Sequence, residues 1–343
     1  MSDPAPPRSG LLAAGNFITD HVKVIDAFPD QDMLVHILSE TVSNGGGPYN
    51  VLVDLANLGA PFPLAAAGLV GDDEDGHRIR QDCADRGIDA SGLRTSDAPT
   101  SYTDAMTVAD TGRRTFFHHR GANARLYPEA VDLAGSRAKI FYLGYLMLLD
   151  TLDALRPDAT TGASVLLAAA STAGFITVAD LVSIAHPEFR RRVLPALPHI
   201  DYLFLNEREA ALVLEADAPL PDDAAAEAIL ALGVRKAVIL HTAAGATVLT
   251  AEGTRIAQPS IAVPAAEIAG ATGAGDAFSA GFLYALHDDQ PLADALRLAL
   301  ATAAASLRAP DPSSAILTAD ECLSLSLRAA PHPPQSPGGC LTT

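Results

Sequence analysis

The stretch Gly270–Phe282 restricts the fold most, because it sets three glycines directly before a helical pattern. Glycine lacks a Cβ, so the backbone can turn sharply there and approach a ligand closely. The apolar residues that follow recur every four positions and therefore share one helix face: Phe278, Phe282 and Leu286. The first N–H groups of such a helix have no partner within it, which favours anion binding by this loop.

A carboxylate, Asp276, lies inside this predicted anion site. As a helix cap alone it is poorly placed, because it repels the phosphate that the site attracts. Its position is explained if the carboxylate removes a proton from a hydroxyl that attacks a phosphate. A glycine-rich turn capped by Asp276, with no ligand, is the alternative that the residues alone leave open.

The run Thr272-Gly273-Ala274-Gly275-Asp276 resembles the C-terminal signature of the ribokinase (PfkB) family of sugar and nucleoside kinases. The resemblance implies phosphoryl transfer from ATP to a hydroxyl, with Asp276 as the catalytic base. It also implies that Gly273, Ala274 and Gly275 form an anion hole, in which the N–H groups of Ala274, Gly275 and Asp276 stabilise charge on the transferring phosphoryl group, and that Thr272 contacts the nucleotide.

A second glycine-rich stretch, Asn44–Asn50, contains three consecutive glycines, which a regular helix or strand does not accommodate. Pro48 suits the first turn of a helix that we expect to run to Leu58. The stretch resembles the family's N-terminal signature, a Gly-Gly pair followed four residues later by Asn. The resemblance implies that Gly46 and Asn50 face the acceptor substrate; a plain loop-to-helix transition is the alternative.

Two further positions are expected to bind the acceptor. Asp20 interrupts the apolar pattern after a first strand over residues 11–17, and is either a turn carboxylate or a hydroxyl acceptor. The segment resembles the family's opening strand, where an Asp at this offset holds the sugar. The tetrapeptide Gly121–Ala124 resembles the one that returns the ribokinase chain to the main domain near the sugar, which implies that Asn123 contacts the substrate.

From Lys139 onward, short apolar runs alternate with helical patterns, which predicts parallel strands covered by helices on both faces. The predicted strands are 140–143, 175–178, 202–205 and 237–241, and the predicted helices include 207–214, 222–232 and 291–307. An earlier strand over 62–68 and a helix over 77–86 belong to the same pattern.

The predicted nucleotide contacts follow two of these strands, at the carboxyl edge where α/β proteins bind ligands. Asn206 and Glu209 match the family's Asn-x-x-Glu motif, which implies that they organise Mg²⁺ through water and the nucleotide phosphates; Asn206 also suits a helix N-cap. The segment after the next strand resembles the family's nucleotide loop, which implies that Thr242 and Gly245 contact ATP.

Four segments alternate in polarity and are expected to form a small antiparallel sheet outside the main domain: 22–27, 35–42, 100–108 and 114–119. In the family such a sheet is a lid over the sugar and often a dimer surface. A sheet this small has little core of its own to cover its apolar face, so we expect a homodimer formed through the lid.

Together these patterns predict a ribokinase-like three-layer α/β/α domain with a mainly parallel sheet plus a small β-sheet lid. The kinase domain is expected over residues 10–328, with the lid from about 20–42 and 100–120. Residues 329–343 are proline-rich and are expected to be a disordered tail.

Composition excludes several other classes of protein. The net charge of −18, from 23 basic and 41 acidic residues, and the lack of a Lys/Arg cluster argue against nucleic-acid or anionic-membrane binding. The longest apolar region, 163–182, is broken by polar residues and does not suit a membrane span. The N-terminus has no signal-peptide pattern, so a cytoplasmic location is expected. The three cysteines lack metal-ligand spacing, and Cys83 is expected in the core.

Two departures from the family pattern bear on the acceptor. Residues 144–147 are apolar where ribokinases usually carry a sugar-binding Glu, and Ile18 stands where they often have Asn. A nucleoside kinase, or a catalytically silent sugar or nucleotide sensor, is therefore an alternative to a sugar kinase. A dinucleotide-dependent dehydrogenase is excluded, because the first strand is not followed by G-x-G-x-x-G.

Gly270 and Ala271 replace a carboxylate and a hydroxyl that help K⁺-activated relatives bind the ion, so weak or altered K⁺ dependence is expected.

Overall fold

The computed structural model describes residues 7–328, so the predicted tail at 329–343 lies outside the described residues. The chain divides into two compact units. The first takes in the described residues up to Val53, together with Phe62–Ile184 and Arg191–Ala196. The second takes in Asp54–Pro61, Ala185–Arg190 and the described residues from Leu197 onward.

The first unit contains five parallel strands in the order β9-β8-β1-β4-β5. Their bounds are β1 Leu11–Gly15, β4 Leu64–Gly71, β5 Asp89–Ser96, β8 Ile140–Leu146 and β9 Ile176–Leu181. Helix α2 (Glu74–Asp85) packs on β4 and β5, and α4 (Gly162–Thr172) packs on β9. Every residue of β1 is buried, which explains why the strand is a continuous apolar run without alternation.

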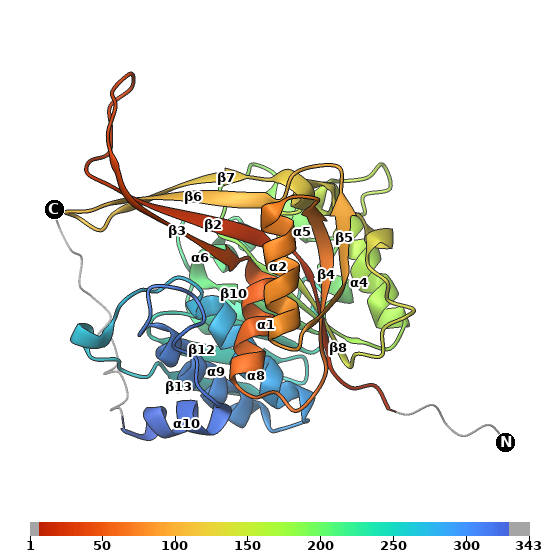
Figure 1. Cartoon of the computed structure of the whole chain (residues 1–343). Helices are drawn as coiled ribbons and strands as arrows, with labels where there is room; N and C mark the ends of the chain where they lie inside the picture. The colour runs from red at the N-terminus through yellow and green to blue at the C-terminus, as the bar shows by residue number, and fades with distance from the viewer. Residues whose placement is uncertain (1–6, 329–343) are drawn as a thin grey trace. The chain divides into compact units, whose positions relative to one another are not determined.

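A separate four-stranded sheet, the lid sheet, also belongs to the first unit (Figure 1). Its strands are β2 Ile18–Ile25, β3 Ile37–Gly45, β6 Ser101–Val108 and β7 Arg114–His119, in the order β3-β2-β6-β7. The prediction of an antiparallel sheet was wrong for one pair, because β2 and β6 run parallel. The connection from β2 to β3 projects beyond the strands in Figure 1 and carries exposed apolar side chains.

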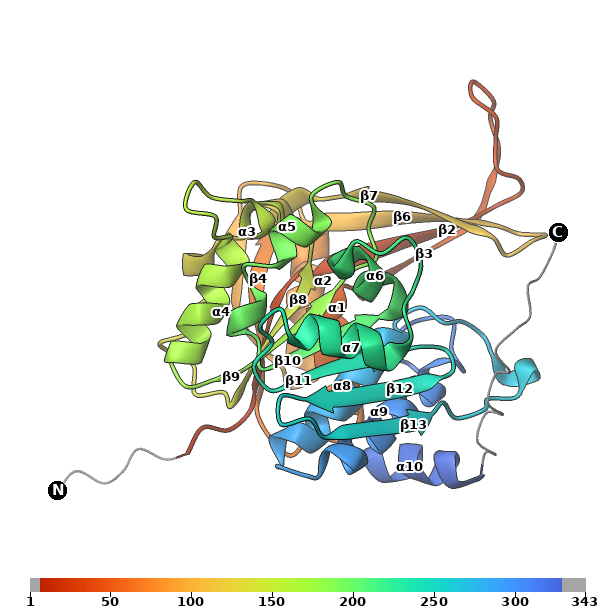
Figure 2. The same cartoon turned by 180° about the vertical axis from the view of Figure 1, so that it is seen from behind.

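The second unit contains four strands in the order β13-β12-β11-β10, of which only β10 and β11 are parallel. Their bounds are β10 Tyr202–Asn206, β11 Ala237–His241, β12 Gly245–Thr250 and β13 Arg255–Pro259. Its helices are α6 Glu207–Leu214, α7 Asp222–Leu230, α8 Ala274–His287, α9 Leu292–Ser306 and α10 Ala319–Arg328. Figure 2 shows α7 in front of these strands and α8 and α9 behind them.

The remaining elements are short or link the two units along the chain. Helix α1 spans Gly47–Asn57, α3 Asp150–Asp153 and α5 Phe189–Val193; 3₁₀ helices lie at Gly121–Arg125, Pro128–Ala130, Leu197–His199 and Ala265–Glu267. Within residues 7–328, no helix is both long enough and apolar enough to cross a membrane.

The predicted face of α8 is confirmed as core. Phe278, Phe282 and Leu286 are all buried, and the Phe204 ring of β10 meets the Phe278 and Phe282 rings edge to face at 6.2 and 5.3 Å. Such aromatic pairs combine a large buried area with a favourable ring geometry. These contacts hold the first turns of α8 against β10, and that position determines where Asp276 lies.

Candidate functional site

The turn before α8 has the geometry that its glycines predicted. Gly273 is the N-cap residue and adopts a left-handed φ of 79°, with no side chain capping the helix. A Cβ on Gly273 would lie 2.8 Å from the Cα of Pro312 and closer still to its Cβ. Only glycine meets both conditions without strain. Gly270 and Thr272 lie in the loop that leads into this turn.

Asp276 occupies the first turn of α8 and is 4% exposed. Within the helix, the N–H of Ala277 donates to the carbonyl of Gly273 at 2.8 Å. The N–H group of Gly275 comes before that bond, at a position where backbone donors have no acceptor inside the helix. Ala274 differs from the prediction, because its N–H already reaches the carbonyl of Ala271 at 3.3 Å. Of the predicted backbone donors, Gly275 is therefore well placed to bind an anion.

His241 connects this turn to the ends of the neighbouring strands. Its register partner is Asn206, so β10 and β11 end side by side. Its ring lies 5.1 Å from the Phe278 ring, and a Cβ on Gly275 would come within 3.6 Å of its Cε1. Burial lowers the pKa of His241 to about 4, so the imidazole is neutral at physiological pH. Sequence reasoning assigned His241 no role, and only the strand register reveals its place.

Asn206 and Glu209 form a reciprocal capping box at the start of α6. The Asn206 side chain accepts from the backbone N–H of Glu209 at 2.9 Å, and Glu209 Oε2 accepts from the backbone N–H of Asn206 at 2.8 Å. Glu209 Oε1 accepts from Asn206 Nδ2 at 2.9 Å. The carboxylate is 4% exposed, and both of its oxygens are oriented by Asn206. The two predicted residues thus act as one rigid group at the end of β10.

Thr242 and Gly245 close a tight turn between β11 and β12. The N–H of Thr242 donates to the carbonyl of Gly245 at 2.8 Å, and the Thr242 hydroxyl accepts from the N–H of Ala244 at 3.1 Å. Thr242 therefore stabilises the turn that a glycine usually occupies in the family. The turn directly follows His241, next to the ends of the strands described above.

The predicted acceptor residues gather in the first unit around residues 16–20. Gly46 has a φ of 98°, and a Cβ there would run into the carbonyl oxygen of Asn16. The N–H of Asn50 donates to the carbonyl of Gly46 at 2.9 Å, which places Asn50 in the first turn of α1. Only glycine allows the chain to pass this close to Asn16 before the helix begins.

Asp20 lies on β2 beside Gly45, where a Cβ would collide with the Asp20 carboxylate. Burial raises the pKa of Asp20 to about 6, and a hydrogen bond from Thr103 opposes that rise. The carboxyl group is thus mostly ionised at neutral pH and can accept hydrogen bonds from hydroxyl groups. Thr103 is a neighbour that sequence patterns did not identify, because it lies 83 residues further along the chain.

Asn123 is 1% exposed and bonds to the backbone of Phe17 at both ends of its amide. Its Nδ2 donates to the carbonyl of Phe17 at 3.0 Å, and its Oδ1 accepts from the N–H of the same residue at 3.4 Å. Asn123 thereby fixes the corner between β1 and β2 from which Asp20 projects. Sequence reasoning also missed Asn16, whose Oδ1 accepts from the N–H of Tyr145 at 3.0 Å.

Other titratable residues have structural roles. Asp73 caps α2 by accepting from the N–H of Gly76 at 2.9 Å, so the helix begins at Glu74, three residues before the predicted start. His118 and His119 lie on opposite faces of β7: the first bonds to Thr103, and the second stacks on Tyr102. Among the residues that the structure describes, no group of three His, Cys, Asp or Glu side chains could hold a metal ion. Cys83 is buried, as predicted.

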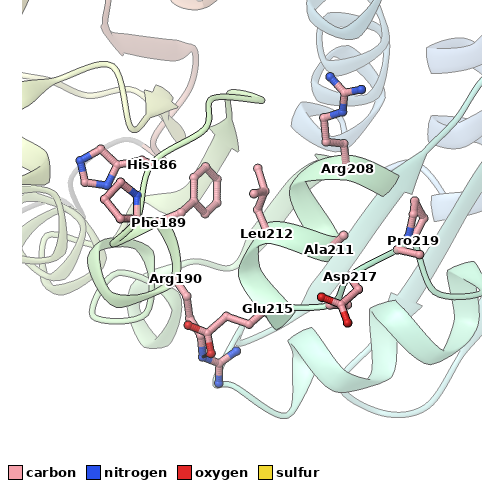
Figure 3. Close-up of a pocket in the computed structure, with 12 residues that line it drawn as sticks. His186, Phe189, Arg190, Arg208, Ala211, Leu212, Glu215, Asp217 and Pro219 are labelled. Carbon is pink, nitrogen blue, oxygen red and sulfur yellow. Dashed lines mark ion pairs between the residues drawn. The ribbon is translucent and has the colours of Figure 1, made fainter.

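A further cavity of about 440 Å³ lies between α6 and residues 186–190, within the second unit (Figure 3). Figure 3 shows Phe189 and Leu212 facing the same space, and an ion pair between Arg190 and Glu215 at its lower edge, 3.8 Å between Nε and Oε2. None of the predicted site residues is among the side chains that line it.

Comparison with known proteins places the chain in a family. The model of the pfkB family carbohydrate kinases matches residues 11–319. The ATP-dependent ribose-1-phosphate kinase of Halopiger xanaduensis is 30% identical over 86% of this chain and 90% of its own length. The ribokinase of Schizosaccharomyces pombe is 25% identical over 89% of this chain and 94% of its own.

Solved structures agree on the fold. The ribokinase of Arabidopsis thaliana complexed with ribose and ATP superimposes with a TM-score of 0.76 at 22% identity, covering 94% of this chain and 99% of that one. The ribokinase of Thermotoga maritima gives a TM-score of 0.74 at 21% identity, covering 93% and 99%. The predicted ribokinase-like fold is confirmed. The chain belongs to the pfkB family of carbohydrate kinases and is an ATP-dependent carbohydrate kinase.

Proposed function

We propose that this kinase transfers the γ-phosphoryl group of ATP to a hydroxyl of a sugar or sugar-like molecule, with Asp276 as the catalytic base. One observation carries the assignment: the buried carboxylate of Asp276 lies in the first turn of α8, directly after the left-handed glycine turn at Gly273 that opens the positive end of the helix. The hydroxyl oxygen attacks the γ-phosphorus, the bond to the β-phosphate oxygen breaks, and Asp276 receives the hydroxyl proton.

The start of α8 supplies the anion hole. The N–H groups of Gly275 and Asp276 and the positive end of the helix dipole stabilise negative charge on the phosphoryl oxygens. Gly273 fixes the direction of these groups through its left-handed turn, and Ala274 continues the same turn. Because His241 is neutral, the charge is stabilised by backbone dipoles and not by an imidazolium.

ATP and Mg²⁺ fit the residues at the ends of β10 and β11. Magnesium keeps several waters and usually takes one or two carboxylates together with substrate phosphates. The capping box suits an indirect contact, since Asn206 already holds both Glu209 oxygens and a water can bridge Glu209 to the ion. Thr242, Gly245 and Thr272 would contact the nucleotide. Bound Mg²⁺ supplies positive charge that offsets the charge of the phosphates.

Asp20, Gly46 and Asn50 would bind the acceptor, and Asn123 would position them through Phe17. The lid segments, about 20–42 and 100–120, belong with these residues to one kinase domain over 10–328. The proposal requires that the acceptor hydroxyl bound by Asp20, Gly46 and Asn50 reaches Asp276 during turnover. A pentose, free or phosphorylated, is the first acceptor to test, because the relatives named above are a ribose-1-phosphate kinase and a ribokinase.

A screen of sugars, sugar phosphates and nucleosides for ADP release, with ATP and Mg²⁺, separates the proposal from its alternatives. Turnover on a nucleoside alone would identify a nucleoside kinase. Binding of ATP without turnover on any acceptor would instead support a silent sugar or nucleotide sensor.

Two variants test the assigned roles. Asp276→Asn keeps the size and shape of the side chain and removes the repulsion of phosphate, so it should fold normally and bind ATP at least as well as the parent. Its turnover should fall about 10²-fold or more, since the general base is lost. Asn50→Ala should raise the KM of the acceptor and leave ATP binding nearly unchanged. If Asp276→Asn retains most of its turnover, the proposed mechanism is wrong.

A further inference from the structure

Strand pairing aligns three polar side chains on one face of the lid sheet. Asp20 on β2 is level with Thr103 on β6, and Thr103 is level with His118 on β7. The Thr103 hydroxyl bonds to Asp20 and lies 3.0 Å from Nδ1 of His118. With that hydroxyl donating to the carboxylate, His118 donates its Nδ1–H to the Thr103 oxygen. The row therefore has a carboxylate at one end and an imidazole at the other.

Arg120 lies two residues after His118, directly beyond the end of β7. Its Nη1 donates to Asp150 Oδ1 at 2.6 Å, and no other partner of its side chain is found among residues 7–328. The side chain is 34% exposed, so it is not enclosed by protein and a ligand can reach it. Burial and the nearby Arg120 charge both hold the pKa of His118 below its usual value.

The two ends of the row suit different parts of one molecule. An ionised Asp20 accepts hydrogen bonds from hydroxyl groups and repels anions. Arg120 presents several donors in a planar fork, which matches the oxygens of a phosphate. Thr103 and His118 lie between Asp20 and Arg120, so the anion of such a ligand is kept away from the Asp20 carboxylate. The Asp150 carboxylate near Arg120 is already paired with that cation.

We infer that the acceptor already carries a phosphate group, which Arg120 holds with His118 beside it, while the hydroxyls of the acceptor bond to Asp20. This inference rests on the proposed function and narrows the acceptor to a phosphorylated sugar. A bound phosphate next to His118 also favours the protonated imidazole, whose Nε2–H then becomes a further donor.

The competing explanation is that Arg120 only stabilises the fold through its ion pair with Asp150. Two variants separate the explanations. Arg120→Met removes the cation, whereas Asp150→Asn removes the ion pair and leaves the cation. Arg125→Met is the matched control, because Arg125 lies on the same segment and pairs with the exposed carboxylate of Asp97.

The assay measures kcat/KM for ribose, ribose 1-phosphate and ribose 5-phosphate at saturating ATP. The parent should favour one of the phosphates over ribose. Arg120→Met should lower kcat/KM for that phosphate by about 10- to 100-fold, the size expected for losing charge-assisted hydrogen bonds, and should leave ribose and the KM of ATP nearly unchanged. Asp150→Asn and Arg125→Met should both retain the preference for the phosphate.

Preference of the parent for ribose would overturn the inference, as would an Asp150→Asn variant that loses as much activity on the phosphate as Arg120→Met. Calorimetry without ATP keeps the inference testable if no acceptor turns over. Binding of the sugar phosphate that Arg120→Met abolishes would support the subsite even if the proposed function failed. Inorganic phosphate that binds as tightly as the sugar phosphate would overturn the inference, because the subsite would then bind any phosphate anion and select no acceptor.

Discussion

Replacing Gly273 by Ala should weaken the fold of the phosphate-binding turn far more than replacing Gly275 by Ala. Gly273 has a φ of 79°, where an L-residue with a Cβ costs about 1–2 kcal/mol. The new methyl would also lie 2.8 Å from the Cα of Pro312, and overpacking of this kind typically costs about 1–3 kcal/mol. The two contributions together predict a loss of about 2–5 kcal/mol in the free energy of unfolding.

Gly275 provides the matched control. It lies inside α8, and a Cβ there would meet nothing closer than Cε1 of His241 at 3.6 Å, an ordinary contact. Because alanine is favoured over glycine within helices by about 0.5–1 kcal/mol, Gly275→Ala should be neutral or slightly stabilising. Thermal unfolding followed by circular dichroism compares the two, and Gly273→Ala should melt on the order of 5–10 °C below the parent.

A double variant separates the two causes of the loss. Pro312→Gly removes the side-chain atoms that the methyl introduced by Gly273→Ala would strike. The double variant should therefore recover the part of the packing cost that the Pro312 side chain causes, a fraction of about 1–3 kcal/mol, relative to the sum of the single variants, while the contact with the Cα of residue 312 persists. The backbone part should remain. Equal melting temperatures for Gly273→Ala and Gly275→Ala would refute the reasoning, since the turn would then be neither left-handed nor closely packed.

Three other predictions follow from the site. The pKa of Asp20 is raised from 3.8 to about 6, so the folded state favours the protonated carboxyl group. The stabilisation that this bound proton gives the fold is complete below about pH 4 and is lost as the pH rises to about 6. The KM of the acceptor should increase below pH 6, where Asp20 becomes protonated, and Asp20→Asn should abolish that pH dependence. Rates in K⁺, Na⁺ and a bulky organic cation should be similar, because Gly270 and Ala271 offer the ion no side-chain oxygen; a severalfold rise specific to K⁺ would contradict this. Light scattering at micromolar concentration should give twice the chain mass of 35.5 kDa, and replacing the exposed Phe116 and Phe117 by Ser should yield monomers; a monomeric parent would rule out the dimer.

The sequence predicted best those features that local backbone chemistry determines. Helix α6 begins and ends where its pattern predicted, because Asn206 and Glu209 cap it through bonds within four residues. The α8 start was recognisable for the same reason, since Gly273 must adopt a left-handed turn whatever surrounds it. Local rules of this kind can be read from one sequence because both partners of each contact are close along the chain.

Features that depend on distant pairing were missed or mistaken. Strands β5 and β13 were not predicted, because neither forms an apolar run. In β13, exposed residues alternate with less exposed ones, and β5 carries polar residues at most positions. The parallel pairing of β2 with β6 was also missed, because no local pattern records which strand lies beside which. The contact of Asn123 with Phe17 was missed for the same reason, because the two residues are 106 positions apart.

The same dependence on register explains why the lid should control the choice of acceptor. Asp20 meets Thr103, and Thr103 meets His118, only because β2, β6 and β7 pair in the observed register. A slip of one residue in β6 would turn Thr103 to the opposite face and present Tyr102 or Asp104 in its place. Asp20 would then lose its hydroxyl partner, and His118 would lose the group that orients its ring. The turn before α8 shares no strand with the lid sheet, so substitutions that shift the lid register should change acceptor affinity and leave ATP affinity unaltered.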